Sequence, residues 1–133
     1  MTQDIDPQLD LFVQAALAKK AEAPVFLDIR RFTSVAEAFL IVSGRSNRQV
    51  SAIAEHIKTD LKKHGIQPLG MEGAKEGHWV LIDYGHVVIH VFYDPVRSFY
   101  DLEGLWSDAP RIQTPAMEAY VKQLAPTETD DDG

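Results

Sequence analysis

The sequence contains no cysteine and no apolar run long enough to cross a bilayer. Without cysteine, disulfide bonds, thiolate nucleophiles and cysteine-ligated metal sites are excluded. A membrane-spanning helix needs roughly 20 apolar residues, and residues 1–10 are acidic and polar, unlike a secretory signal. We therefore expect a cytoplasmic protein, and 133 residues suit one domain with a single core.

Basic residues are also scarce. The chain has 13 Lys and Arg against 20 Asp and Glu, which gives a net charge of −7. Because phosphate neutralisation by Lys and Arg supplies most of the affinity for nucleic acid, we expect little direct contact with RNA or DNA. Any partner in a nucleoprotein particle is then expected to be a protein component.

The familiar catalytic signatures are missing as well. There is no Walker A loop, no Gly-x-Gly-x-x-Gly fingerprint and no Gly-x-Ser-x-Gly elbow. Five histidines invite a metal hypothesis, but His86 and His90 lie four apart on an expected strand and so about 13 Å apart. We predict no metal site, no cofactor and no catalytic residue.

The first half of the chain predicts a helix, two strands and a second helix. Asp6-Pro7 begins the first helix, which we expect Pro24 to stop, and strands follow at Val25–Ile29 and Phe39–Ser43. The second strand is apolar without alternation, as expected for burial on both faces.

The second helix is the clearest element in the sequence. Ser46 with Gln49 forms a capping box, and Gly65 is a natural C-terminal cap. Ser46 is thus a cap rather than a nucleophile. The apolar stripe comprises Val50, Ile53, Ala54, Ile57 and Leu61.

A β-hairpin is expected at residues 78–84 and 87–93, turning around Gly85, with residues 67–71 as an edge strand beside it. Alternation of side chains defines two faces. The core face holds Val80, Ile82, Tyr84, Val87, Ile89, Val91 and Tyr93, with His78 at its end, and is expected beneath the helices.

The opposite face, called the mixed face below, holds Trp79, Leu81, Asp83, Val88, His90 and Phe92. One interpretation is a second buried face with a satisfied Asp83–His90 pair. The other is a partly exposed binding face with Trp79 as its anchor, since Trp is enriched among interface hot spots. Periodicity alone does not separate these interpretations.

The last part of the chain predicts two short helices. Residues 96–106 are expected to form one with a turn at Gly104 and with Phe99, Tyr100 and Trp106 facing the core. Thr114-Pro115 begins the other. We divide the chain into a domain over residues 1–112, a C-terminal helix over 113–125 and a disordered acidic tail over 126–133.

Five linked blocks resemble the ribosomal silencing factor family, also called Iojap or RsfS. They comprise Phe39-Leu-Ile-Val-Ser-Gly44, Ser46-Asn-Arg-Gln-Val50, Glu76-Gly-His-Trp-Val-Leu-Ile-Asp-Tyr-Gly85, Val88-Ile-His-Val-Phe92, and Arg97-Ser-Phe-Tyr-Asp-Leu-Glu-Gly-Leu-Trp106 with Asp108-Ala109. The resemblance runs from about residue 9 to residue 109.

This resemblance implies an α/β (α+β) fold with a mixed β-sheet of about five strands and helices, similar to nucleotidyltransferases. It implies binding to a ribosomal protein of the large subunit at the inter-subunit face, which blocks association of the small and large ribosomal subunits and represses translation. It also implies a homodimer when free, and it implies no enzyme.

The family pattern places the partner contacts on Trp79 and Asp83, with Tyr84 at the turn beside them. Arg48 and Arg97 are expected as polar contacts at the rim. His86 stands where many relatives have an acidic residue, which puts a charge contact at that turn in doubt.

Two alternatives stay open. A nucleotidyltransferase places a Gly-Ser pair before a helix and two metal-binding carboxylates in an Asp-x-Asp pattern, whereas here Ser43-Gly44 has the reverse order and Asp83 stands alone on its strand. A plain dimerisation module would bury the mixed face against a second copy.

Overall fold

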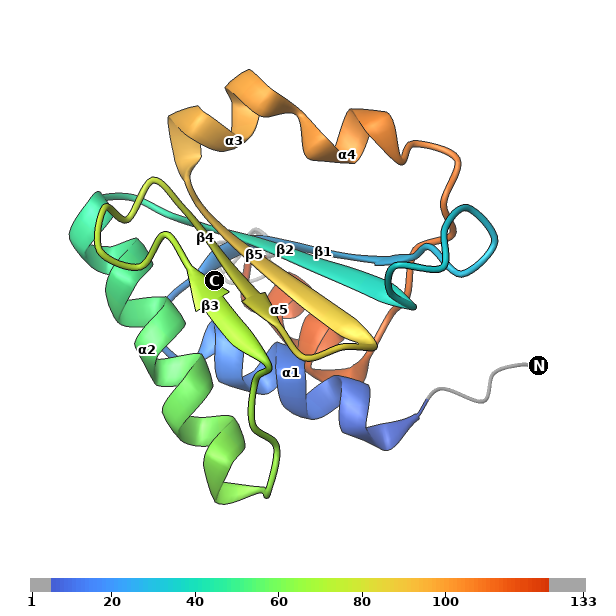
Figure 1. The fold of residues 1–133 in the computed structure, drawn as a ribbon, viewed down its shortest axis with the longest axis horizontal. Helices are drawn as coiled ribbons and strands as arrows, with labels where there is room; N and C mark the ends of the chain where they lie inside the picture. The colour runs from blue at the N-terminus through green and yellow to red at the C-terminus, as the bar shows by residue number, and fades with distance from the viewer. Residues whose placement is uncertain (1–5, 125–133) are drawn as a thin grey trace, which may run out of the picture.

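The computed structural model describes residues 6–124, which form one mixed sheet and five helices (Figure 1). The strands are β1 Glu22–Asp28, β2 Ala38–Gly44, β3 Gly70–Glu72, β4 Trp79–Asp83 and β5 Val87–Tyr93. The helices are α1 Pro7–Leu17, α2 Asn47–Lys63, α3 Asp94–Tyr100, α4 Leu102–Leu105 and α5 Pro115–Leu124. The expected α+β class with a five-stranded mixed sheet is confirmed.

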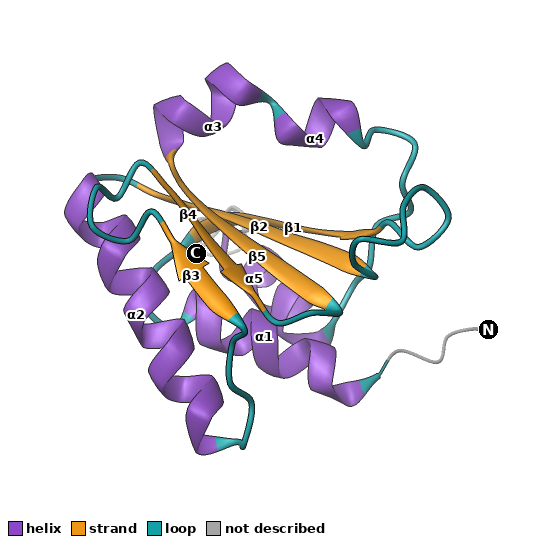
Figure 2. Cartoon of the chain, viewed as in Figure 1, coloured by secondary structure: helices purple, strands orange, loops and turns teal. Residues whose placement is uncertain are grey.

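The sheet has the strand order β1-β2-β5-β4-β3. Only β2 and β5 are parallel, and they lie at its centre. Helices α1, α2 and α5 cover one face, and α3 with α4 cross the other (Figure 2). Within residues 6–124, no helix combines the length and the apolar character needed to cross a membrane.

Helix α1 begins as expected but ends earlier. The Asp6 side chain accepts the N–H of Gln8 at 2.9 Å, and the last helical residue is Leu17. The prediction that Pro24 stops the helix was wrong, because Pro24 lies within β1. Proline is tolerated there because β1 is an edge strand with a register irregularity between Glu22 and Val25.

Helix α2 and strand β2 match the prediction closely. The Ser46 hydroxyl accepts the N–H of Gln49, while the Gln49 amide oxygen accepts the N–H of Arg45 rather than that of Ser46. Gly65 has a φ of 78° and closes the helix with its N–H on the Lys62 carbonyl. The five stripe residues of α2 are fully buried, and all seven residues of β2 are buried.

The hairpin register assigns each side chain to a face. Trp79 pairs with Phe92 and Asp83 with Val88, and the N–H of Tyr84 donates to the Val87 carbonyl across the Gly85-His86 loop. The core face packs beneath α1, α2 and α5, as expected. The expected edge strand also forms, although β3 is shorter and lies later in the chain than residues 67–71.

The segment after β5 differs from the prediction. Helix α3 starts at Asp94 without a loop, and the break between α3 and α4 falls at Asp101, which has a φ of 48°, rather than at Gly104. Phe99 and Tyr100 are exposed rather than core residues. Arg97 is instead the residue of α3 whose side chain is buried against the sheet.

The two outer edges of the sheet are protected in different ways. Segment 110–112 runs beside β1, where the Ile112 N–H donates to the Phe26 carbonyl at 2.8 Å. The Tyr120 hydroxyl of α5 accepts the N–H of Ala23 near the start of the same strand. At the other side, β3 has only three residues.

Candidate protein-binding face

The mixed face of the sheet is partly covered by α3 and α4, so its two sides differ in burial. Its β5 residues Val88, His90 and Phe92 are buried. Its β4 residues Trp79, Leu81 and Asp83 remain half-buried. The β4 side of the face is therefore accessible to a partner, whereas the β5 side is core.

The Asp83–His90 pair required by the first interpretation is replaced by two other hydrogen bonds. The Trp79 indole Nε1–H donates to His90 Nδ1 at 3.1 Å, and the Asp83 carboxylate accepts the N–H of Gly85 at 2.7 Å. Burial lowers the pKa of His90 to about 4, because the charged imidazolium is poorly solvated there. The ring is thus neutral at physiological pH.

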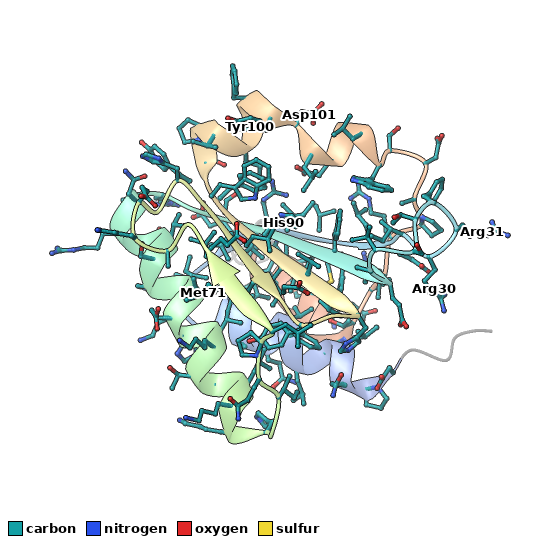
Figure 3. The ribbon with its side chains drawn as sticks, viewed as in Figure 1. Arg30, Arg31, Met71, His90, Tyr100 and Asp101 are labelled. Carbon is teal, nitrogen blue, oxygen red and sulfur yellow. The ribbon has the colours of Figure 1, made fainter. Side chains whose placement is uncertain are left out.

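Trp79 opens onto two exposed aromatic rings from α3. Its ring centroid lies 5.0 Å from that of Tyr100, which lies 5.1 Å from that of Phe99. Phe99 is 80% exposed and Tyr100 is 53% exposed. Trp79, Tyr100 and Phe99 are called the aromatic patch below, and Figure 3 shows Tyr100 at the end of α3 with His90 on the sheet beneath that helix.

Carboxylates flank the aromatic patch. Glu72 pairs with Leu81 across the β3–β4 ladder and therefore shares the mixed face with Asp83. Asp101 follows Tyr100 and is exposed (Figure 3). An exposed apolar cluster with acidic groups beside it complements a partner surface that is apolar and basic.

Tyr84 lies on the opposite face from the aromatic patch. Its ring packs 5.2 Å from Phe12 of α1, and the residue is buried. Burial raises the pKa of the Tyr84 hydroxyl to about 12. The sequence placed Tyr84 beside Trp79 and Asp83 at the turn, but the structure places its side chain in the core beneath the helices.

Arg97 is also buried, at 7% exposure, which was not expected of a residue at a polar rim. Its guanidinium donates to the Ser43 hydroxyl at 2.7 Å and forms an ion pair with Glu103 at 2.9 Å. The Arg97 hydrogen bond lowers the pKa of the Glu103 carboxyl. Arg97 therefore joins α3 and α4 to the end of β2.

Arg48 is exposed on the first turn of α2. Ser51, three residues later on α2, donates its hydroxyl hydrogen to the Ala74 carbonyl at 2.6 Å and so joins α2 to the loop preceding Trp79.

The residues considered for nucleotidyl transfer have structural partners. Ser43 is buried under Arg97 at the end of β2, and Asp83 holds the turn at Gly85. Over residues 6–124, His, Asp and Glu do not form a group of three or more that could hold a metal ion.

A family model described as "Ribosomal silencing factor during starvation" matches residues 2–132 of the chain. The chain belongs to this ribosomal silencing factor family. The match extends past the last of the five sequence blocks to residue 132 and includes the C-terminal helix. Ribosomal silencing factors and Iojap proteins both occur among its relatives.

The relatives are similar over most of the chain. A protein named Ribosomal silencing factor RsfS from Bacillus subtilis is 50% identical over 92 residues, which are 69% of this chain and 78% of that protein. One from Halalkalibacterium halodurans is 44% identical over 79% of this chain and 90% of its own length. The chloroplastic Iojap protein of Zea mays is 31% identical over 77% of this chain and 44% of that protein.

The fold is shared with solved structures. A crystal structure of a protein from Chromobacterium violaceum superposes with a TM-score of 0.75 at 36% identity, covering 85% of this chain and 91% of that one. The family expected from the sequence blocks is thus confirmed by family model, by relatives and by fold.

Proposed function

We propose that this protein silences translation by binding a ribosomal protein of the large subunit through the aromatic patch and the β4 side of the mixed face. The observation that carries the proposal is the pair of exposed rings, Phe99 and Tyr100, continuous with half-buried Trp79. Exposed aromatic clusters mark protein-binding surfaces, and Trp and Tyr are enriched among their hot spots. The description of the family supports ribosomal silencing as the process in which we propose the surface acts.

The charge of the surface supports a protein partner over RNA. Glu72 and Asp101 near the aromatic patch, with Asp83 at the far end of β4, would repel rRNA phosphates but attract lysine and arginine side chains. A ribosomal protein carries such basic groups because it sits among phosphates. The partner would therefore place an apolar side chain on the rings and basic side chains on the carboxylates.

The mechanism is steric occlusion, without a chemical step. A bound protein of 133 residues on the inter-subunit face occupies volume that the small subunit needs when it joins. The standard interface of about 800 Å² per partner is enough to hold it there. The role of this chain is thus to recognise and to block.

The test is sedimentation of the purified protein with separated ribosomal subunits. We expect the protein to migrate with the large subunit and not with the small one, and to lower the fraction of joined ribosomes when both subunits are present. Migration with the small subunit, or with neither subunit, would contradict the proposal.

Two matched variants locate the surface. Phe99→Ser removes an exposed ring of the aromatic patch, and Val121→Ser removes an exposed apolar side chain on α5, across the sheet. Loss of an interface hot spot costs about 2 kcal/mol, so Phe99→Ser should weaken large-subunit binding roughly thirtyfold. Val121→Ser should bind like the wild type. Equal binding by both variants would show that the aromatic patch is not the interface.

The same exposed rings favour self-association of the free protein. We propose a homodimer that buries the aromatic patch and must part before the ribosome is bound. Light scattering should then give a dimer mass for the wild type and a monomer mass for Phe99→Ser. A Phe99→Ser variant that remains dimeric but no longer binds large subunits would separate the two surfaces.

A further inference from the structure

The indole N–H of Trp79 has a partner inside the protein. Trp79 Nε1 donates to His90 Nδ1 across 3.1 Å between neighbouring positions of β4 and β5. Because Nδ1 accepts this bond, the neutral ring carries its proton on Nε2. An imidazolium would present donors at both nitrogens and could not accept the indole N–H.

His90 is itself buried among aromatic rings. It is 4% exposed on a central strand, with the Phe39 ring edge-on at 4.8 Å and the Phe92 ring stacked at 6.2 Å. The acceptor for Trp79 is therefore a buried group of the core packed against aromatic rings, in contrast to an exposed surface side chain.

The Trp79 ring is held from three sides. Its N–H points to His90, its face lies 4.7 Å from Phe92, and Tyr100 lies 5.0 Å away toward solvent. Without the His90 acceptor, the indole N–H would be left half-buried without a partner, and the ring could satisfy it only by turning toward water.

We infer that His90 is a positioning residue, which holds Trp79 with its N–H turned into the protein so that a partner meets only the carbon atoms and π-face of the indole. This inference rests on the proposed function, because it assigns Trp79 to the partner-binding face. It specifies the chemistry of the contact. The partner places an apolar or cationic group against Trp79 and donates its hydrogen bonds to carboxylates of the mixed face such as Asp83.

The first experiment observes the indole N–H directly in the free protein. The chain has two tryptophans, so the ¹H–¹⁵N spectrum holds two indole signals, and Trp79→Phe assigns them. His90→Leu removes the acceptor and keeps an apolar side chain, while His90→Asn places an amide oxygen close to the position of Nδ1. We expect slow solvent exchange of the Trp79 N–H in the wild type and in His90→Asn, and exchange at least tenfold faster in His90→Leu. Equal exchange in all three would overturn the inference.

The second experiment measures large-subunit binding by the same proteins. His90→Leu should weaken binding about tenfold or more, whereas Trp79→Phe, which lacks the N–H but keeps a ring, should bind far better than Trp79→Ala. Loss of binding in Trp79→Phe equal to that in Trp79→Ala would overturn the inference, because the N–H would then be a contact of the partner.

The two experiments test the proposed function and the role of His90 separately. A wild-type protein that binds no ribosomal subunit would refute the proposed function, while the exchange measurement would still decide whether His90 positions Trp79. Should His90→Leu fail to fold, the comparison of Trp79→Phe with Trp79→Ala tests the orientation without altering His90.

Discussion

Arg97 offers the sharpest test of how α3 is held above the sheet. The substitution Arg97→Met keeps an unbranched side chain of similar length and removes the guanidinium. Two groups then lose a partner: the Ser43 hydroxyl, which is buried, and the Glu103 carboxylate, whose side chain is 26% exposed. Because the Arg97 side chain is only 8% exposed, solvent screens its ion pair weakly.

The magnitude follows from these burials. Breaking a fully buried ion pair costs roughly 3–5 kcal/mol, and an exposed pair is worth about 0–1 kcal/mol. The Arg97–Glu103 pair lies between these limits, at about 2 kcal/mol, and an unpartnered buried hydroxyl adds roughly 1 kcal/mol. The total of about 3 kcal/mol should lower the melting temperature of a chain this size by roughly 10 °C.

Urea unfolding followed by circular dichroism measures the loss, and Arg30→Met is the matched control. Arg30, labelled in Figure 3, forms a slightly shorter ion pair with Asp28, at 2.7 Å, but its side chain is 67% exposed. We expect a loss below about 1 kcal/mol for Arg30→Met. Similar losses in both variants would refute the reasoning that burial sets the strength of the Arg97 contacts.

Three further predictions concern stability. The buried neutral His90 has a pKa of about 4 in the folded state and an ordinary value of 6.5, so the unfolded state binds the extra proton between these values and stability should fall by about 2 kcal/mol from pH 7 to pH 5. Urea midpoints at the two pH values measure this, and His90→Leu should remove that part of the dependence. Gly77→Ala should be more destabilising than Gly65→Ala, since both have positive φ but only at Gly77 would a Cβ meet backbone, 2.4 Å from the Asn47 carbonyl oxygen; thermal denaturation of the pair decides it. Ile57→Ala, at a fully buried position of α2, should cost about 2–5 kcal/mol in the same unfolding assay, and a loss under 1 kcal/mol would contradict its place in the core.

The sequence predicted best where one local rule governed the outcome. The capping of α2 by Ser46 and Gly65 depends on residues close in the chain, and the faces of the hairpin depend only on alternation and on the turn at Gly85. In these places the local sequence pattern and the tertiary packing favour the same structure, so the local pattern alone predicts it.

The predictions were wrong where contacts between residues far apart in the sequence determine the structure. Nothing near Arg97 indicates that Ser43, 54 residues away, would draw its guanidinium into the core. Asp101 adopts a left-handed conformation that ends α3, whereas the sequence predicted the break three residues later, at Gly104. The binding-site residues themselves remain predictions until the variants are measured.

The treatment of the sheet edges limits how copies of this protein can associate. A long unpaired strand recruits other chains through backbone hydrogen bonds and leads to open-ended polymers. Here β1 is lined by segment 110–112 and by Tyr120, and β3 offers three residues after Pro68. Continuous strand addition is thus disfavoured at both ends, and association is left to side chains on the faces. Contacts of that kind are saturable and reversible, as the proposed binding to a ribosome requires.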